Sequence, residues 1–162
     1  MANSVDKNQA VINFLMTCPQ ISSNPLFFNF INAKDNNKQF VTTGNERTIH
    51  RPYIDGSVLK RYTFTIIDFK SIAYNAIVNA SGYPDENVEE MLEVQDIIDW
   101  IQEQSDNRNY PDFGNDCIIE EMNVLTDNPN LNGVDTSVQP MLAKYSISIQ
   151  IDYLDISKQI FK

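Results

Sequence analysis

The residue types that most often carry out catalysis are sparse in this chain of 162 residues. Histidine occurs once, at His50, beside Arg47 and Arg51. A single histidine cannot build a histidine-based metal site, and its two positively charged neighbours oppose cation binding. Ser–His and Cys–His nucleophile pairs would both require this same residue. We therefore predict no catalytic role for His50.

Carboxylates are the one reactive group present in quantity. The clearest pairs are Glu89 with Glu93 and Asp96 with Asp99. Such pairs can act as acid and base or bind a divalent ion, but their spacing is also typical of a solvated helix face, which we favour. The run Asp127–Asn130 lacks the later glycine and glutamate of a calcium loop, and glycine-rich phosphate loops are absent. The sequence predicts no enzyme, no cofactor and no metal.

The composition indicates an acidic globular chain. Hydrophobic residues make up 42% and charged residues 21%, and the formal net charge is −10, which disfavours nucleic-acid binding. Cys18 and Cys117 have no metal-type spacing and are expected to be free thiols in a reducing cytoplasm, unless the fold brings them together as a disulfide. No signal-peptide pattern and no stretch of ~20 apolar residues is present. We expect a cytosol-like setting and no membrane.

The first third of the chain predicts a helix followed by a hairpin. Val11, Phe14 and Leu15 have helical spacing, with Ser4 or Asp6 as the cap and Pro19 as the stop. An aromatic run at 26–31 and a β-rich run at 39–43 are separated by polar residues, which predicts an antiparallel hairpin. Residues 44–57 are predicted to form a loop.

The remainder predicts three long elements of a sheet and one long helix. Strands are expected at 58–69, 117–125 and 142–154. In the last, apolar and polar residues alternate strictly from Tyr145 to Tyr153. A helix with acidic faces is expected at 85–103, and a polar stretch with turns at 126–140. The fold class is α+β: a single domain, 1–162, with a mainly antiparallel sheet on which an N-terminal helix and a second long helix pack.

Charge is distributed unevenly along the chain. Seven basic residues lie between 34 and 70, whereas the stretch from 71 to 135 holds Arg108 as its one basic residue against fifteen acidic ones. Copies of such a chain can associate head to tail, and contacts of this kind close into rings. The alternative is that the two segments neutralise each other within one molecule, and the sequence leaves both open. The basic residues are Lys34, Lys38, Arg47, Arg51, Lys60, Arg61 and Lys70.

Several strings of residues carry a resemblance to a known family. In order they are Pro52–Ser57, Lys60–Ile66, Asn107–Gly114, Leu131–Asp135 and Ala143–Ile147. They resemble the tail-terminator proteins of long-tailed bacteriophages of Gram-positive hosts, often labelled minor capsid proteins. The resemblance runs from about Val5 to Leu154, and the residues after 154 are a candidate extension.

The resemblance implies an assembly role in the virion. Tail terminators form a ring, usually a hexamer, that ends the tail tube and joins it to the neck connector at the tail–neck junction, after assembly in the host cytoplasm. Partners would be further copies, the tube protein, the neck protein and, in a contractile tail, the sheath protein; DNA would pass through without specific binding. Acidic residues expected to face the lumen are Glu89, Glu93 and Asp96. Residues expected at a subunit or tube interface are Arg47, Arg51, Lys60, Arg61, Asn132 and Asp135.

Three other functions fit the sequence less well. A head-side neck connector or stopper would share the ring geometry but contact the portal. A small cytosolic binding protein would stay monomeric or dimeric. A hydrolase using a metal held by Asp and Glu would need a site that these residues do not assemble.

Overall fold

Two strands of 14 residues each form the spine of the sheet. β4 (Val58–Ser71) and β7 (Leu142–Asp155) pair antiparallel over their full length, from Val58 opposite Asp155 to Ser71 opposite Leu142. Both are rich in the β-branched and aromatic residues that suit a pleated surface. The chain is seen here in a computed structural model, which describes residues 6–22, 26–28, 37–42, 49–71, 86–126, 130–135 and 142–160.

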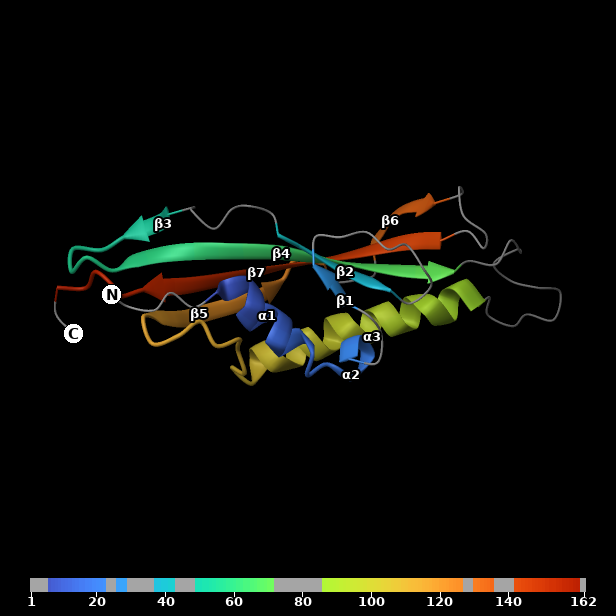
Figure 1. The fold of residues 1–162 in the computed structure, drawn as a ribbon, viewed down its shortest axis with the longest axis horizontal. Coiled ribbons are helices and arrows are strands. Elements are labelled where there is room, and N and C mark those ends of the chain that lie inside the picture. Colours follow the sequence, from blue (N-terminus) through green and yellow to red (C-terminus); the bar gives the residue numbers. More distant parts are fainter. Residues whose placement is uncertain are drawn as a thin grey trace.

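Each spine strand pairs with two shorter strands along its other edge (Figure 1). β4 pairs with β3 (Ile49–Pro52) and β2 (Lys38–Thr42), and β7 pairs with β5 (Cys117–Val124) and β6 (Asn130–Asp135), all antiparallel. β1 (Leu26–Phe28) adds to β2 in parallel. The described residues therefore form one mainly antiparallel sheet of seven strands.

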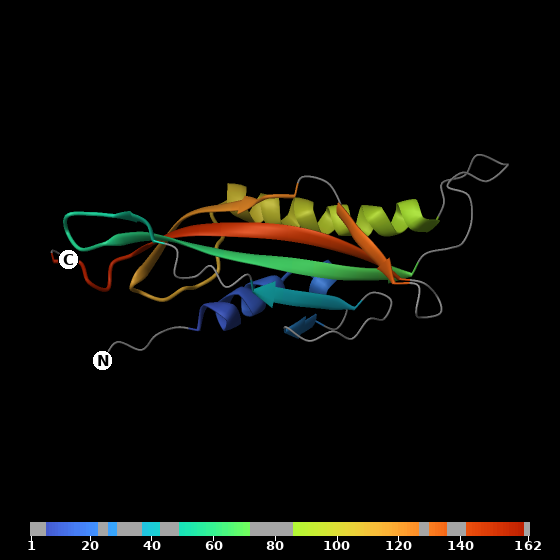
Figure 2. The same cartoon turned by 90° about the horizontal axis from the view of Figure 1, so that it is seen from above.

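All helices of the described residues lie on one face of this sheet, and the molecule is elongated along the spine (Figures 1 and 2). They are α1 (Lys7–Leu15), the short α2 (Pro19–Ser22) and α3 (Glu86–Asp106). Inward-facing spine residues such as Phe64 and Ile149 are buried beneath them together with α3 residues such as Ile97. The predicted α+β class, with two main helices packed on the sheet, is confirmed.

The N-terminal helix begins where a capping residue was predicted. The Asp6 side chain accepts hydrogen bonds from the backbone N–H groups of Asn8 and Gln9, which satisfies two of the unpaired donors of the first turn. The helix ends at Leu15, and Pro19 begins α2 instead of acting only as a stop, since proline fits the first helical position. Ser4 lies outside the described residues, as does Asp85, which precedes α3.

Three sequence predictions of strands and loops are wrong. β1 and β2 pair in parallel, so the hairpin at 26–31 and 39–43 does not form; β2 pairs antiparallel with β4 instead, Phe40 opposite Ile66. The predicted loop at 44–57 contains β3, and the polar stretch at 126–140 contains β6. These short strands exist because a spine strand offers them a partner, which local periodicity does not reveal.

The β3–β4 turn is locked against the C-terminal segment. Gly56 adopts a φ of +90°, which favours glycine. The Ile160 N–H donates to the Asp55 carbonyl at 2.6 Å, and the Gln159 amide donates to the Asp55 carboxylate at 2.8 Å. A Cβ at Gly56 would overlap the Lys158 carbonyl oxygen. The turn and the segment after Asp155 thus form one unit, which we call the arm end (residues 53–57 and 156–160).

We predict that Gly56→Ala lowers the free energy of unfolding by about 2 kcal/mol, because it combines a strained φ with overlap against the Lys158 carbonyl. Gly133→Ala is the matched control: its φ of +152° is also unusual, but a Cβ there meets nothing within 4 Å. Chemical denaturation measures both, and hydrogen exchange at the Ile160 amide reports the arm end. Equal losses in the two variants would show that the contact with Lys158 contributes nothing.

Candidate functional site

A cluster of four charged side chains lies between the sheet and α3. Asp68 stands opposite Lys38 of β2 in the strand register, and their side chains are 3.6 Å apart. Lys70, two residues along β4 on the same face, lies 3.7 Å from Asp68 and 2.7 Å from Glu93 of α3. The side chains of Lys38, Asp68 and Lys70 are fully buried, while that of Glu93 is partly exposed. The cluster therefore ties β2, β4 and α3 together.

Asp68 is the buried carboxylate of this cluster whose hydrogen bonds are not satisfied. Neither carboxylate oxygen has a hydrogen-bond partner among the described residues. Burial raises the pKa of Asp68 to about 6, against the attraction of Lys38 and Lys70. At neutral pH the charges of Lys38 and Lys70 balance those of Asp68 and Glu93. Because the oxygens of Asp68 lack hydrogen bonds, the cost of burying its charge offsets much of the attraction within the cluster. The cluster therefore contributes little to the stability of the fold, and its main effect is to select the arrangement in which β2, β4 and α3 pack together.

The acidic residues predicted to face a lumen do not act as one group. Glu93 pairs with Lys70 of the sheet, whereas Asp96, about one turn further along α3, is exposed. Glu89 lies in α3, but its side chain is outside the described residues. The exposed face of α3 is still acidic in its second half. It carries Asp96, Asp99, Glu103 and Asp106.

Lys60 and Arg61, predicted at an interface, have partners within the chain. Lys60 donates to Asp155 at 2.8 Å, and Arg61 binds Asp152 through two nitrogens at 2.9 and 3.4 Å. Burial opposes ionisation of Asp155, but hydrogen bonds from Lys60 and Ser157 outweigh it and lower its pKa to about 2. Both basic residues are therefore paired within the molecule, but with carboxylates of β7 and not with those of the acidic stretch from 71 to 135.

The other predicted interface residues are placed only in part. Arg51 lies in β3, and Asn132 and Asp135 lie in β6, but the side chains of all three, like that of His50, are outside the described residues. Arg47 lies outside them altogether. The sequence prediction for these four interface residues therefore stays a prediction.

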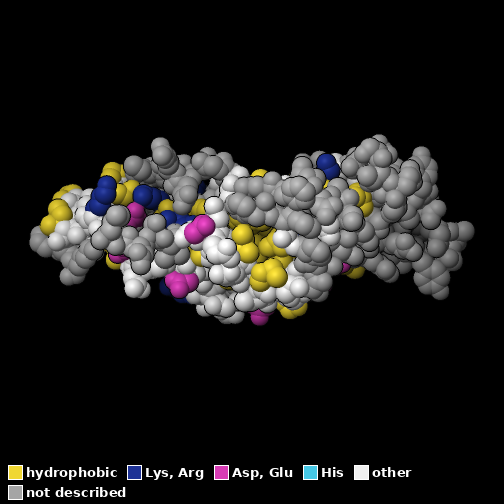
Figure 3. Space-filling model, viewed as in Figure 1, with side chains coloured by type: hydrophobic (Ala, Val, Ile, Leu, Met, Phe, Trp, Pro, Cys, Tyr) yellow, Lys and Arg dark blue, Asp and Glu magenta, His cyan; other side chains and the backbone are white. Residues whose placement is uncertain are grey.

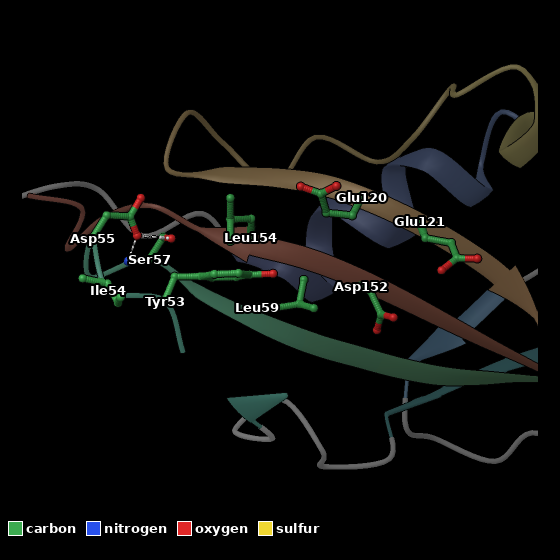
Figure 4. Close-up of a pocket in the computed structure, with 9 residues that line it drawn as sticks. All are labelled: Tyr53, Ile54, Asp55, Ser57, Leu59, Glu120, Glu121, Asp152 and Leu154. Atoms are coloured by element: carbon green, nitrogen blue, oxygen red, sulfur yellow. Dashed lines mark hydrogen bonds between the residues drawn. The ribbon is translucent and has the colours of Figure 1, made fainter. Parts of the chain in front are cut away.

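A groove runs over the helix-free face of the sheet beside the arm end (Figure 4). Its volume is about 640 Å³, within the ~300–1,000 Å³ of ligand sites. Leu59 and Leu154 face each other in the register and form an apolar floor, and Tyr53 reaches over it from the turn. The full lining is Tyr53, Ile54, Asp55, Ser57, Leu59, Glu120, Glu121, Asp152 and Leu154.

Carboxylates surround this apolar floor. Glu120 and Glu121 lie exposed where β5 shifts its register against β7. Hydrogen bonds, chiefly from the side chains of Ser57 and Gln159, lower the pKa of Asp55. Asp152 is paired with Arg61. The groove therefore combines an apolar floor with an acidic rim, an arrangement suited to binding by shape and charge.

Neither cysteine thiol is activated in the described part of the chain. Both cysteines are free, and burial raises the pKa of the Cys18 and Cys117 thiols, the opposite of what activates a thiolate. Among the described residues no three His, Cys, Asp or Glu side chains are grouped to hold a metal ion.

Sequence reasoning missed both the buried cluster and the groove, although signals exist for each. Glu93 shares helical spacing with buried Ile97 and Ile101, which places it on the inner face of α3. Leu154 breaks the alternation of β7, because it is an apolar residue that follows four polar residues, Ser146 to Asp152, on the same face. Glu93 is a charged residue at an apolar helical spacing, and Leu154 is an apolar residue among polar ones on a strand. Exceptions of this kind indicate candidate sites.

The chain was also compared with known proteins. No protein-family model matches it, and no curated protein matches it. Within the described residues, no helix is both long and apolar enough to cross a bilayer. The groove, the arm end, the exposed face of α3 and the resemblance of the residue strings are the features that bear on function.

We predict that Asp68 makes stability fall as pH rises. Its folded pKa of about 6 exceeds the ordinary 3.8, so the stabilisation is present in acid and is lost as pH rises through 6. Between pH 4 and pH 7 the unfolding free energy of the wild type should fall by about 2 kcal/mol relative to that of Asp68→Asn. Denaturation of both proteins at the two values measures this. A constant difference would mean that Asp68 is not desolvated.

Asp155 should show the opposite sign. Its folded pKa of about 2 lies below the ordinary 3.8, so its contribution is present above pH 3.8 and is lost as pH falls toward 2. Because solvent screens this partly exposed ion pair, we expect Asp155→Asn to cost about 1 kcal/mol at pH 7 and clearly less near pH 2. Denaturant titrations at both values test this, and a penalty that persists undiminished in acid would refute the ion pair as its cause.

Proposed function

We propose that this protein is a non-enzymatic structural subunit of a bacteriophage tail, a terminator that forms a ring on the tail tube and joins it to the neck. The residue strings that resemble tail terminators support this. Pro52–Ser57 forms the turn at the arm end, and Lys60–Ile66 forms the part of β4 that leads away from it. Two of the five strings thus lie at and beside one extremity of the molecule.

The observation that carries the proposal is the exposure of apolar side chains at that extremity. Ile54 is fully exposed, and Tyr53 and Ile160 are exposed beside it. Hydrophobic side chains reach the surface at this end of the elongated molecule (Figure 3). Clustered exposed apolar residues mark interaction sites, because a lone soluble chain gains nothing from keeping them in water. We take the arm end as a contact of the assembled tail.

The charge of α3 supports a second part of the proposal. Asp96, Asp99 and Glu103 lie exposed on the side away from the sheet. This acidic face of α3 repels the phosphate backbone of DNA. Such repulsion suits a surface past which DNA moves without binding. Glu93 contributes less to this face than its position suggests, because it is paired with Lys70.

Mixing the purified chain with tail-tube subunits tests the proposal. We expect electron microscopy to show a ring at one end of each tube and a halt in tube growth. Ile54→Asp should weaken capping by roughly tenfold or more, since it removes an exposed apolar contact without touching the core. Leu92→Asp, at an exposed apolar residue of α3, is the matched control and should cap normally.

Two outcomes would overturn the assignment. Tubes that keep growing in the presence of the wild type would exclude a terminator. Binding to a portal instead of to tubes would indicate a head-side connector.

A further inference from the structure

The helix-free face of the sheet is polar in the middle of the spine and becomes apolar near the arm end. Thr63 faces Gln150 and Thr65 faces Ser148 across the two spine strands. Nearer the arm end the same face carries a row of three apolar residues in register across the sheet. They are Leu59, Leu154 and Ile118.

This row is accessible in the described structure. Ile118 is exposed on β5, and Leu59 and Leu154 are partly exposed on the floor of the groove. Tyr53 reaches over the floor from the turn (Figure 4). An apolar floor with an aromatic wall favours a ligand that buries apolar side chains in it.

The edge of the groove on β5 is built to resist sheet extension. The register shift between Ile119 and Glu121 is a bulge, and Glu120 and Glu121 place two charges there. The Ser105 hydroxyl of α3 donates to the Met122 carbonyl of the same strand. Bulges, charges and a covering helix are the devices that keep edge strands from pairing. A partner is therefore expected to lie on the face and not to add a strand at this edge.

Charge decides between a second copy and a different protein as the occupant. Among the described side chains that line the groove, Glu120, Glu121 and Asp55 are acidic and none is basic, and the nearby Arg61 is bound to Asp152. A second copy also carries a net charge of −10, so its overall charge opposes binding to an acidic groove. Complementarity favours a basic partner.

We propose that this groove binds an extended segment of another protein in which lysine or arginine alternates with apolar residues. Side chains of an extended segment alternate with a period of two, so apolar residues would meet Leu59 and Leu154 while basic ones reach Glu120 and Glu121. This inference rests on the proposed function, because the partner is taken to be a protein that contacts the arm end within the tail. It adds the chemistry of the segment that this partner would present.

A short capped peptide alternating lysine and valine is the probe, with a glutamate–valine peptide of equal length as the comparison. Amide shifts in NMR spectra of the isolated chain should change for residues 53–59, 118–121 and 152–154. Glu120→Gln with Glu121→Gln should weaken binding about fivefold, because each of the two exposed charge pairs makes a small contribution to affinity. Glu103→Gln with Asp106→Asn removes the same charge from α3 and should leave the affinity unchanged.

The proposal is overturned if the glutamate–valine peptide binds equally well, if the shifts map to α3, or if neutralising Glu120 and Glu121 leaves the affinity unchanged. Native mass spectrometry showing dimers that Ile54→Asp abolishes would make a second copy the occupant, which also overturns it. Tube capping without peptide binding would refute this inference alone. Peptide binding without tube capping would refute the tail-terminator assignment alone.

Discussion

The antiparallel pairing of β4 with β7 is the constraint on which the rest of the structure depends. Side chains of paired strands alternate between faces, so one register places Phe64 and Ile149 in the core and Leu59 and Leu154 on the opposite face. A slip of one residue would exchange core and surface over the full length of both strands. The same register sets Arg61 beside Asp152 at the groove. Core, ion pairs and groove thus follow from one alignment.

The buried charges at the other end of the spine add specificity at a cost in stability. Lys38 stands opposite Asp68 only in the observed β2–β4 register, and Glu93 reaches Lys70 only with α3 seated over the sheet. An alternative packing would leave at least one of these charges buried and unpaired, which is strongly unfavourable. A neutral core would hold these elements together without distinguishing among their arrangements.

Elements with their own local signal could be predicted, and those defined by distant partners could not. The alternation of β7 and the Asp6 cap are local, and both were predicted from the sequence. β3 and β6 are strands because β4 and β7 pair with them. Of the candidate site, the ion pair of Glu93 with Lys70 was not predicted, because it depends on how α3 packs on the sheet. The groove joins residues almost a hundred positions apart, which no local pattern relates.

The central claim is that the arm end is where this subunit meets its assembly. Hydrogen–deuterium exchange of the chain, free and bound to tail tubes, tests it most directly. We expect slower exchange on binding at Tyr53–Leu59, around Glu121 and in the segment after Asp155, with no change on the exposed face of α3. Unchanged exchange at the arm end, or slowing confined to α3, would contradict the claim.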